Sequence, residues 1–221
     1  MRQRPALTAV TAFACVSLIG ACEWSDAGAA AEDPGAAPAL EARDSEASRT
    51  RPPVHIDSIF PIDEEIRRFR ATIDTQPVEL GGGAAGSVTE LVARFRAALE
   101  RSDTAALRSL IIDRTEFAHL YYPHTVYTRE PYELPPGLVW FQIQQNGEKG
   151  ILRALRLYGG TTGMLGEHTC EPEPVAEGPN RLWQECTVSV RSGDDIESKR
   201  VFGSVLERDG RFKFVSYAND L

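Results

Sequence analysis

The sequence has little positive charge and very little lysine. Lysine occurs only at Lys149, Lys199 and Lys213, and the 221 residues include 24 basic and 32 acidic ones, a formal net charge of −8. Nucleic-acid binding depends on basic contacts to phosphates, so this balance argues against a nucleic-acid partner. It argues equally against a polybasic attachment to anionic lipids.

The start of the sequence also lacks an apolar run long enough to span a bilayer, which needs about 20 residues. Its largely apolar segment, residues 6–19, follows Arg2 and Arg4 and ends in small residues. This order of charged, apolar and small residues is typical of a secretory signal peptide.

The segment Ile19-Gly20-Ala21-Cys22, at the end of this run, resembles the lipobox of bacterial lipoproteins. The resemblance implies that residues 1–21 are removed and that the thiol of Cys22 carries lipid, which anchors the chain at about 0.8 kcal/mol per buried methylene. An ordinary signal peptide with an incidental or disulfide-bonded Cys22 is the alternative. Glu23 stands where an aspartate often retains lipoproteins at the inner membrane, which favours the outer membrane. We therefore expect a membrane-anchored lipoprotein that faces the periplasm or the cell exterior.

The composition changes again near residue 53. Residues 22–53 are rich in Ala, Asp, Glu, Pro and Ser and contain almost nothing large and apolar. Such a segment cannot bury enough surface to offset its ordering entropy, so we expect a flexible tether. The remaining residues, 54–221, have the length of a single domain.

The first half of this domain carries helical signals. Apolar residues recur at helical spacing over residues 59–73 and 88–99. Ser87 to Glu90 match a capping box, and Asp103 and Asp113 occupy positions typical of helix N-caps.

The second half changes from helical to alternating patterns. Residues 138–158 are predicted to form two helical pieces, weakened at Asn146-Gly147 and closed by Gly159-Gly160. Strands are then expected at residues 182–191, 201–207 and 211–217. Asp209-Gly210 between the last two is typical of a tight hairpin. Helices followed by an antiparallel β-meander predict an α+β domain with the helices packed on the sheet.

The helix VARFRAALERSD (residues 92–103), its continuation through Leu110-Ile111 and the closing strand DGRFKFV (residues 209–215) resemble nuclear-transport-factor-2-like domains. That group includes SnoaL-like proteins and ketosteroid isomerases. The resemblance implies a cone-like fold in which a curved sheet wraps around helices and encloses an apolar pocket. The helical segment 138–158 departs from the usual minimal cone.

Cys170 and Cys186 are the cysteines of the expected domain. A secreted location makes a disulfide chemically available, and a bridge across this loop would stabilise the domain by about 3 kcal/mol. Redox or metal chemistry that includes His168 is the alternative. Because no second close pair of ligands and no Cys-x-x-Cys motif accompanies these residues, we predict a structural disulfide.

The densest group of chemically capable side chains lies between residues 116 and 133. Glu116 and His119 are one helical turn apart, so they could face one cavity and act as general acid and base. Glu116 also fits the capping box that starts at Asp113, which explains it without any chemistry. The candidate ligand-binding residues are Glu116, His119, Tyr122, His124, Tyr127 and Trp140.

No motif in the sequence assigns a catalytic residue, a metal site or a cofactor. Gly81-Gly82-Gly83 lacks the Lys and Ser/Thr of a nucleotide-binding loop, and there is no Gly-x-Ser-x-Gly elbow. We therefore expect a non-catalytic envelope protein that binds a small apolar ligand or a protein partner. An isomerase- or cyclase-type enzyme that uses the 116–133 group, and a structural component of an envelope assembly, are the alternatives.

Overall fold

The computed structural model describes residues 60–221. The predicted signal peptide (residues 1–21), the lipid acceptor Cys22 and the predicted tether (residues 22–53) lie outside the described residues. Among the helices of residues 60–221, none combines the length and the apolar character needed to cross a membrane.

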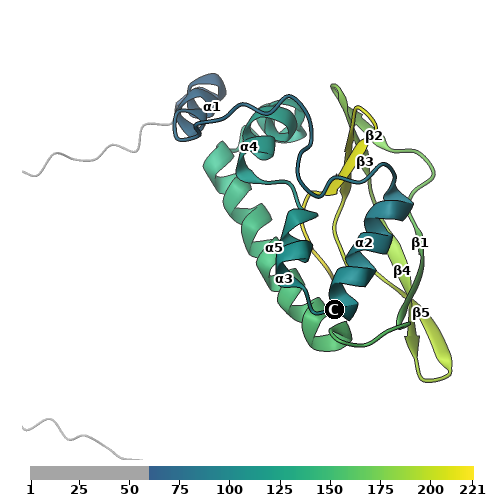
Figure 1. The fold of residues 1–221 in the computed structure, drawn as a ribbon. Helices are drawn as coiled ribbons and strands as arrows, with labels where there is room; N and C mark the ends of the chain where they lie inside the picture. Colours follow the sequence, from purple (N-terminus) through teal and green to yellow (C-terminus); the bar gives the residue numbers. More distant parts are fainter. Residues whose placement is uncertain (1–59) are drawn as a thin grey trace, which may run out of the picture. The chain divides into compact units, whose positions relative to one another are not determined.

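Short helices make up the first part of the domain (Figure 1). They are α1 (Ile62–Arg70), α2 (Val88–Glu100), α3 (Thr104–Ser109), α4 (Arg114–Glu116) and the π-helix η1 (Phe117–Tyr121). The predicted N-caps Asp103 and Asp113 are confirmed, since the carboxylate of each accepts from an amide in its helix's first turn. At α2, Ser87 accepts from the amide of Glu90, but the Glu90 carboxylate returns to the amide of Gly86.

Helix α5 (Pro136–Tyr158) is continuous over 23 residues, so the prediction of two helical pieces is wrong. The glycines inside it are packing positions. A Cβ at Gly147 would lie 3.4 Å from Cδ1 of Ile111, and one at Gly150 would lie 1.8 Å from the carbonyl oxygen of Tyr217. Both residues are buried, so neighbouring segments of the chain pack directly against the backbone of α5 there. The segment before α5 holds two 3₁₀ turns, η2 (Tyr122–His124) and η3 (Val126–Thr128).

Seven antiparallel strands follow, and they confirm the α+β class. They form a three-stranded sheet in the order β1-β4-β5 and a four-stranded sheet in the order β2-β3-β6-β7. Their bounds are β1 Leu165–Thr169, β2 Val175–Glu177, β3 Asn180–Trp183, β4 Thr187–Ser192, β5 Asp195–Lys199, β6 Val205–Arg208 and β7 Arg211–Phe214.

The predicted strand 182–191 is divided between the two sheets. Its first part belongs to β3 and its second part to β4, and Glu185 between them has φ of 45°. A positive φ is rare outside glycine, so a glutamate at this position does not indicate a break. The alternation of apolar and polar side chains continues past it and predicts a single strand. The hairpin at Asp209-Gly210 is confirmed, and both residues have the positive φ that a type I′ turn requires.

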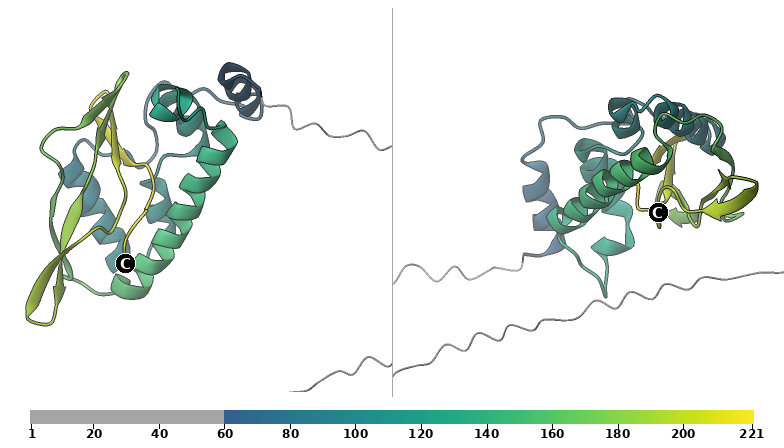
Figure 2. Two further views of the ribbon diagram at one scale, coloured as in Figure 1. Left: turned by 180° about the vertical axis from the view of Figure 1, so that it is seen from behind. Right: turned by 90° about the horizontal axis from the view of Figure 1, so that it is seen from below.

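Two hydrophobic clusters form the core, and both are built from residues 66–221. Helix α2 lies beside α5 and the strands (Figure 2) and contacts α5, β1 and β7. Its Phe95 belongs to the first cluster. The centroid of this ring lies 5.3–5.7 Å from three other buried rings, those of Phe202, Phe214 and Tyr217. Phe117 of η1 has the same role in the second cluster, where it contacts the rings of Phe69, Tyr122 and Trp140. Within the described residues, the two clusters join the helices to both sheets.

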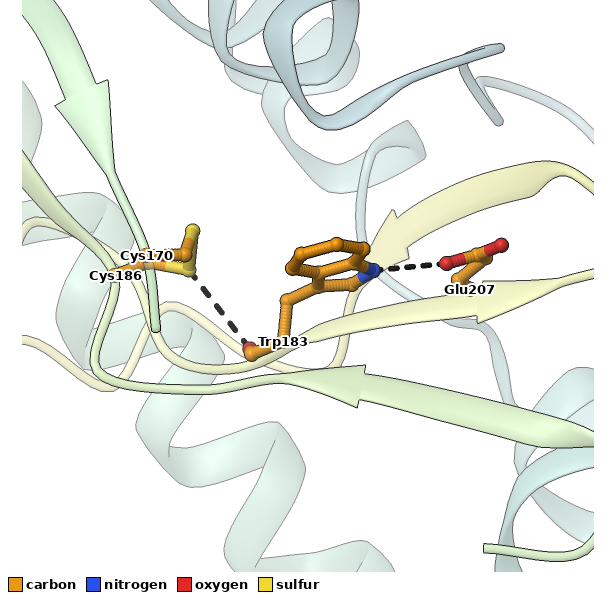
Figure 3. Close-up of a disulfide and its surroundings, with 4 residues drawn as sticks. All are labelled: Cys170, Trp183, Cys186 and Glu207. Carbon is orange, nitrogen blue, oxygen red and sulfur yellow. Dashed lines mark hydrogen bonds between the residues drawn. A yellow bond between two sulfur atoms is a disulfide. The ribbon is translucent and has the colours of Figure 1, made fainter. Parts of the chain in front are cut away.

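The predicted disulfide between Cys170 and Cys186 is confirmed (Figure 3). The register of β1 and β4 pairs Thr169 with Thr187, so the two cysteines stand one step beyond the last pair of this ladder. The bridge closes a loop that contains β2 and β3. Beside it, the indole of Trp183 donates a hydrogen bond to a Glu207 carboxylate oxygen (2.9 Å).

Candidate functional site

A cavity of about 230 Å³ lies between α5 and the segments that flank β4, β6 and β7. Its lining residues include Tyr121 of η1, Tyr127 of η3 and Cys186 of the disulfide. It is smaller than the pockets of about 300–1,000 Å³ that hold drug-sized ligands.

The floor of the cavity, which is its buried lining, is mostly apolar. It is formed by Tyr121, Val139, Cys186, Val215 and Ser216 together with the half-buried Ile143. The Ser216 hydroxyl accepts a hydrogen bond from the amide of Ala218. Val139 and Ile143 are four residues apart, so they lie on one face of α5. The floor contains no charged side chain.

The rim of the cavity is polar. Gln142 and Asn146 are also four residues apart on α5, on a neighbouring face, and both are exposed. Across from α5 the rim includes Glu185 and Arg200. Arg200 donates to an Asp220 carboxylate oxygen (2.7 Å), and this hydrogen bond raises the pKa of its guanidinium. The rim therefore carries both signs of charge, and its cation already has an acidic partner.

The backbone of η1, which presents Tyr121, is held from three sides. Arg70 donates to the carbonyl of Ala118 (3.0 Å), and Asn180 and Arg208 donate to the carbonyl of Leu120 (2.8 and 3.1 Å). These carbonyls lie in a five-residue π-helix. The π-helix is a rare backbone conformation, and a large share of its occurrences lie at functional sites. Tyr121 is thus placed by contacts from α1, β3 and β6.

Tyr121 is 7% exposed, and no hydrogen bond joins its hydroxyl to any other group of residues 60–221. Burial raises the pKa of this phenol far above its usual value of 10, and the nearby Glu177 and Tyr127 raise it further. The hydroxyl therefore remains protonated and available as a hydrogen-bond donor at neutral pH.

Glu116, the first of the predicted site residues, has a structural role. Its carboxylate completes the capping box by accepting from the amide of Asp113 (2.8 Å), and it also accepts from the amide of Gly81 (2.7 Å). The ammonium of Lys213 lies 2.9 and 3.0 Å from its two oxygens. All these contacts are inside the protein, so the carboxylate has no free position for a ligand.

The other predicted site residues do not converge either. Only Tyr127 lines the cavity. Tyr122 is fully buried and donates to the carbonyl of Leu134, while Trp140 lines a separate, shallower pocket of about 170 Å³. His119 and His124 are half-buried outside the cavity, and burial lowers the pKa of each imidazole, as do nearby arginines. The predicted site residues therefore lie in different parts of the domain and do not form one site.

The sequence analysis missed most of the residues that do line the cavity. Tyr121 lies within the 116–133 group but is not among the candidate ligand-binding residues predicted from it. Gln142 and Asn146 carried a usable signal, because polar residues spaced four apart share a helix face. Nothing in the sequence around Arg200 indicates that it reaches the same place.

Within the described part of the chain, no group of three or more His, Cys, Asp or Glu residues is arranged to hold a metal ion. No protein-family model, no curated protein and no solved structure matches this chain.

Proposed function

We propose that this chain is a lipid-anchored envelope protein whose domain binds a small, largely apolar ligand in the cavity beside α5. The observation that carries the proposal is the composition of the cavity wall, in which the buried lining is mostly apolar and the exposed rim is polar. Sites for small molecules are typically concave and mostly apolar, with a few polar groups that fix the orientation of the ligand.

The proposal includes membership of the nuclear-transport-factor-2-like group, in which helices and a sheet enclose a pocket. Helices that precede antiparallel strands, and a cavity between α5 and strand segments, support this membership. The lipobox at Ile19 to Cys22 supports the anchor.

Binding without catalysis is favoured by the identity of the lining residues. Glu185 is the one carboxylate among them, and none of them is a histidine. The Glu185 carboxylate is exposed, and a general acid–base pair for the isomerase-type alternative would have to combine it with the phenol of Tyr121 or Tyr127.

The ligand-binding proposal is tested by native mass spectrometry of the full-length chain isolated from membranes. The wild type is expected to show an extra mass that is lost on denaturation. Asn146→Trp, which puts a large side chain at the rim, should abolish this mass, whereas the neighbouring exposed substitution Gln145→Trp should retain it. A wild-type mass equal to that of the lipidated chain alone would count against the function.

The anchor is tested separately. Cys22→Ala is expected to move the protein from the membrane fraction to the soluble fraction, because no thiol remains to accept the lipid. A Cys22→Ala protein that still fractionates with membranes would refute lipidation at this position.

A further inference from the structure

The cavity floor contains one polar group without a protein partner, the hydroxyl of Tyr121. Four side-chain atoms in the described residues are both sealed from solvent and unpartnered: Oε2 of Glu177, Nε of Arg200, Nε of Arg208 and Oδ1 of Asn219. The hydroxyl of Tyr121 is not one of them, although it too has no partner in residues 60–221. It therefore retains some contact with solvent, and Tyr121 lines the cavity.

We propose that the ligand of this cavity is an uncharged molecule with an apolar body and one oxygen that hydrogen bonds to the Tyr121 hydroxyl. This inference rests on the proposed binding function and specifies its ligand class. Burying a hydroxyl without a partner is unfavourable, so a ligand that supplies the partner gains affinity that a purely apolar ligand does not.

Two charged residues line the cavity, Glu185, which is exposed, and Arg200, whose guanidinium is hydrogen bonded to Asp220 and whose unpartnered Nε is sealed from solvent. Neither requires a charged ligand, and a charge placed deeper, among the buried lining residues, would be desolvated without compensation. The size follows from the volume of about 230 Å³, which admits a single ring with a short substituent.

Two probes of nearly equal shape separate these contributions. Benzyl alcohol and ethylbenzene both present a phenyl ring, and they differ by an oxygen in place of a methyl group. The chain from residue 23 to 221, which contains both hydrophobic clusters, is produced in an oxidising compartment, and each probe is titrated while amide NMR shifts are recorded. The variants are Tyr121→Phe and, as a matched control, Tyr158→Phe, a buried tyrosine of α5 that does not line the cavity.

Tyr121→Phe is expected to weaken the binding of benzyl alcohol about tenfold, since one hydrogen bond is lost, and to leave ethylbenzene within about twofold. Tyr158→Phe should change neither. If Tyr121→Phe affects both probes equally, or neither, while Asn146→Trp still blocks them, the assignment of the hydroxyl is overturned and the binding function survives. If the wild type binds neither probe, the inference is overturned, and the native mass spectrum of the membrane-derived chain decides separately whether the proposed function survives.

Discussion

Substitution of Lys213 by methionine tests whether the buried ion pair with Glu116 holds three segments of the domain together. The two side chains are 3% and 2% exposed, and the ammonium lies within 3.0 Å of both carboxylate oxygens. Through the same carboxylate, β7 is joined to α4 and to the loop at Gly81. Methionine is close in volume to lysine, so the change removes the charge and leaves the packing nearly intact.

The expected loss in the free energy of unfolding follows from the contacts that Glu116 keeps after the substitution. The Glu116 carboxylate keeps two amide donors, those of Gly81 and Asp113, but loses its only cation. Removing one partner of a buried pair costs about 3–5 kcal/mol, because an uncompensated charge stays in the interior. With a urea m-value of about 2 kcal/mol/M, the unfolding midpoint should fall by about 1.5–2.5 M.

The assay is urea unfolding followed by tryptophan fluorescence. The double variant Glu116→Gln/Lys213→Met should be more stable than Lys213→Met alone, since it leaves no charge buried. Arg108→Met, which breaks the exposed pair with Glu148, is the control and should leave the midpoint nearly unchanged. A Lys213→Met midpoint equal to that of the wild type, or a double variant no more stable than the single one, would refute the reasoning.

Three further predictions concern the disulfide, a glycine of α5 and the histidines. Reduction of Cys170–Cys186 should lower the free energy of unfolding by about 3 kcal/mol, measured by urea unfolding with and without reductant; an unchanged midpoint would contradict this. Gly150→Ala should lower the melting temperature far more than Gly147→Ala, because only at Gly150 would the new Cβ clash with a carbonyl oxygen, that of Tyr217; equal melting temperatures would show that α5 can shift. Burial lowers the pKa of three imidazoles below 6.5, those of His119, His124 and His168. The unfolded chain therefore binds more protons, and stability should decline as the pH falls from about 7.5 to 5.5. Replacing all three by glutamine should flatten this decline, and an unaltered slope in urea midpoints would exclude them as its source.

The sequence predicted local elements well where a cap or a turn residue marks them. Asp103, Asp113 and Asp209-Gly210 stand where short polar side chains or a glycine satisfy the backbone at an element's end. It failed at Gly147, because a glycine inside a helix can weaken the helix or admit a close neighbour, and only the packing partner decides between these outcomes. The strand prediction also failed at Glu185. This residue has a left-handed backbone where the chain passes from β3 in one sheet to β4 in the other.

The candidate site was harder to predict, because its wall is assembled from distant segments. Glu116 and His119 are close in sequence, and proximity suggested a shared role. Glu116 instead pairs with Lys213, 97 residues away, and this contact is invisible to any local pattern. Tyr121 lines the cavity together with Arg200, which directly follows β5 of the three-stranded sheet and is distant from Tyr121 in the sequence.

The register of β1 and β4 also has a consequence for the order of folding. Hairpins β2–β3, β4–β5 and β6–β7 join neighbours in the sequence, so each can form by closing a short turn. Pairing of β1 with β4 must instead span the whole β2–β3 hairpin, and it is this ladder that brings Cys170 opposite Cys186. Formation of this disulfide therefore reports when β1 pairs with β4. Trapping free thiols at successive times during folding would measure the rate of that pairing.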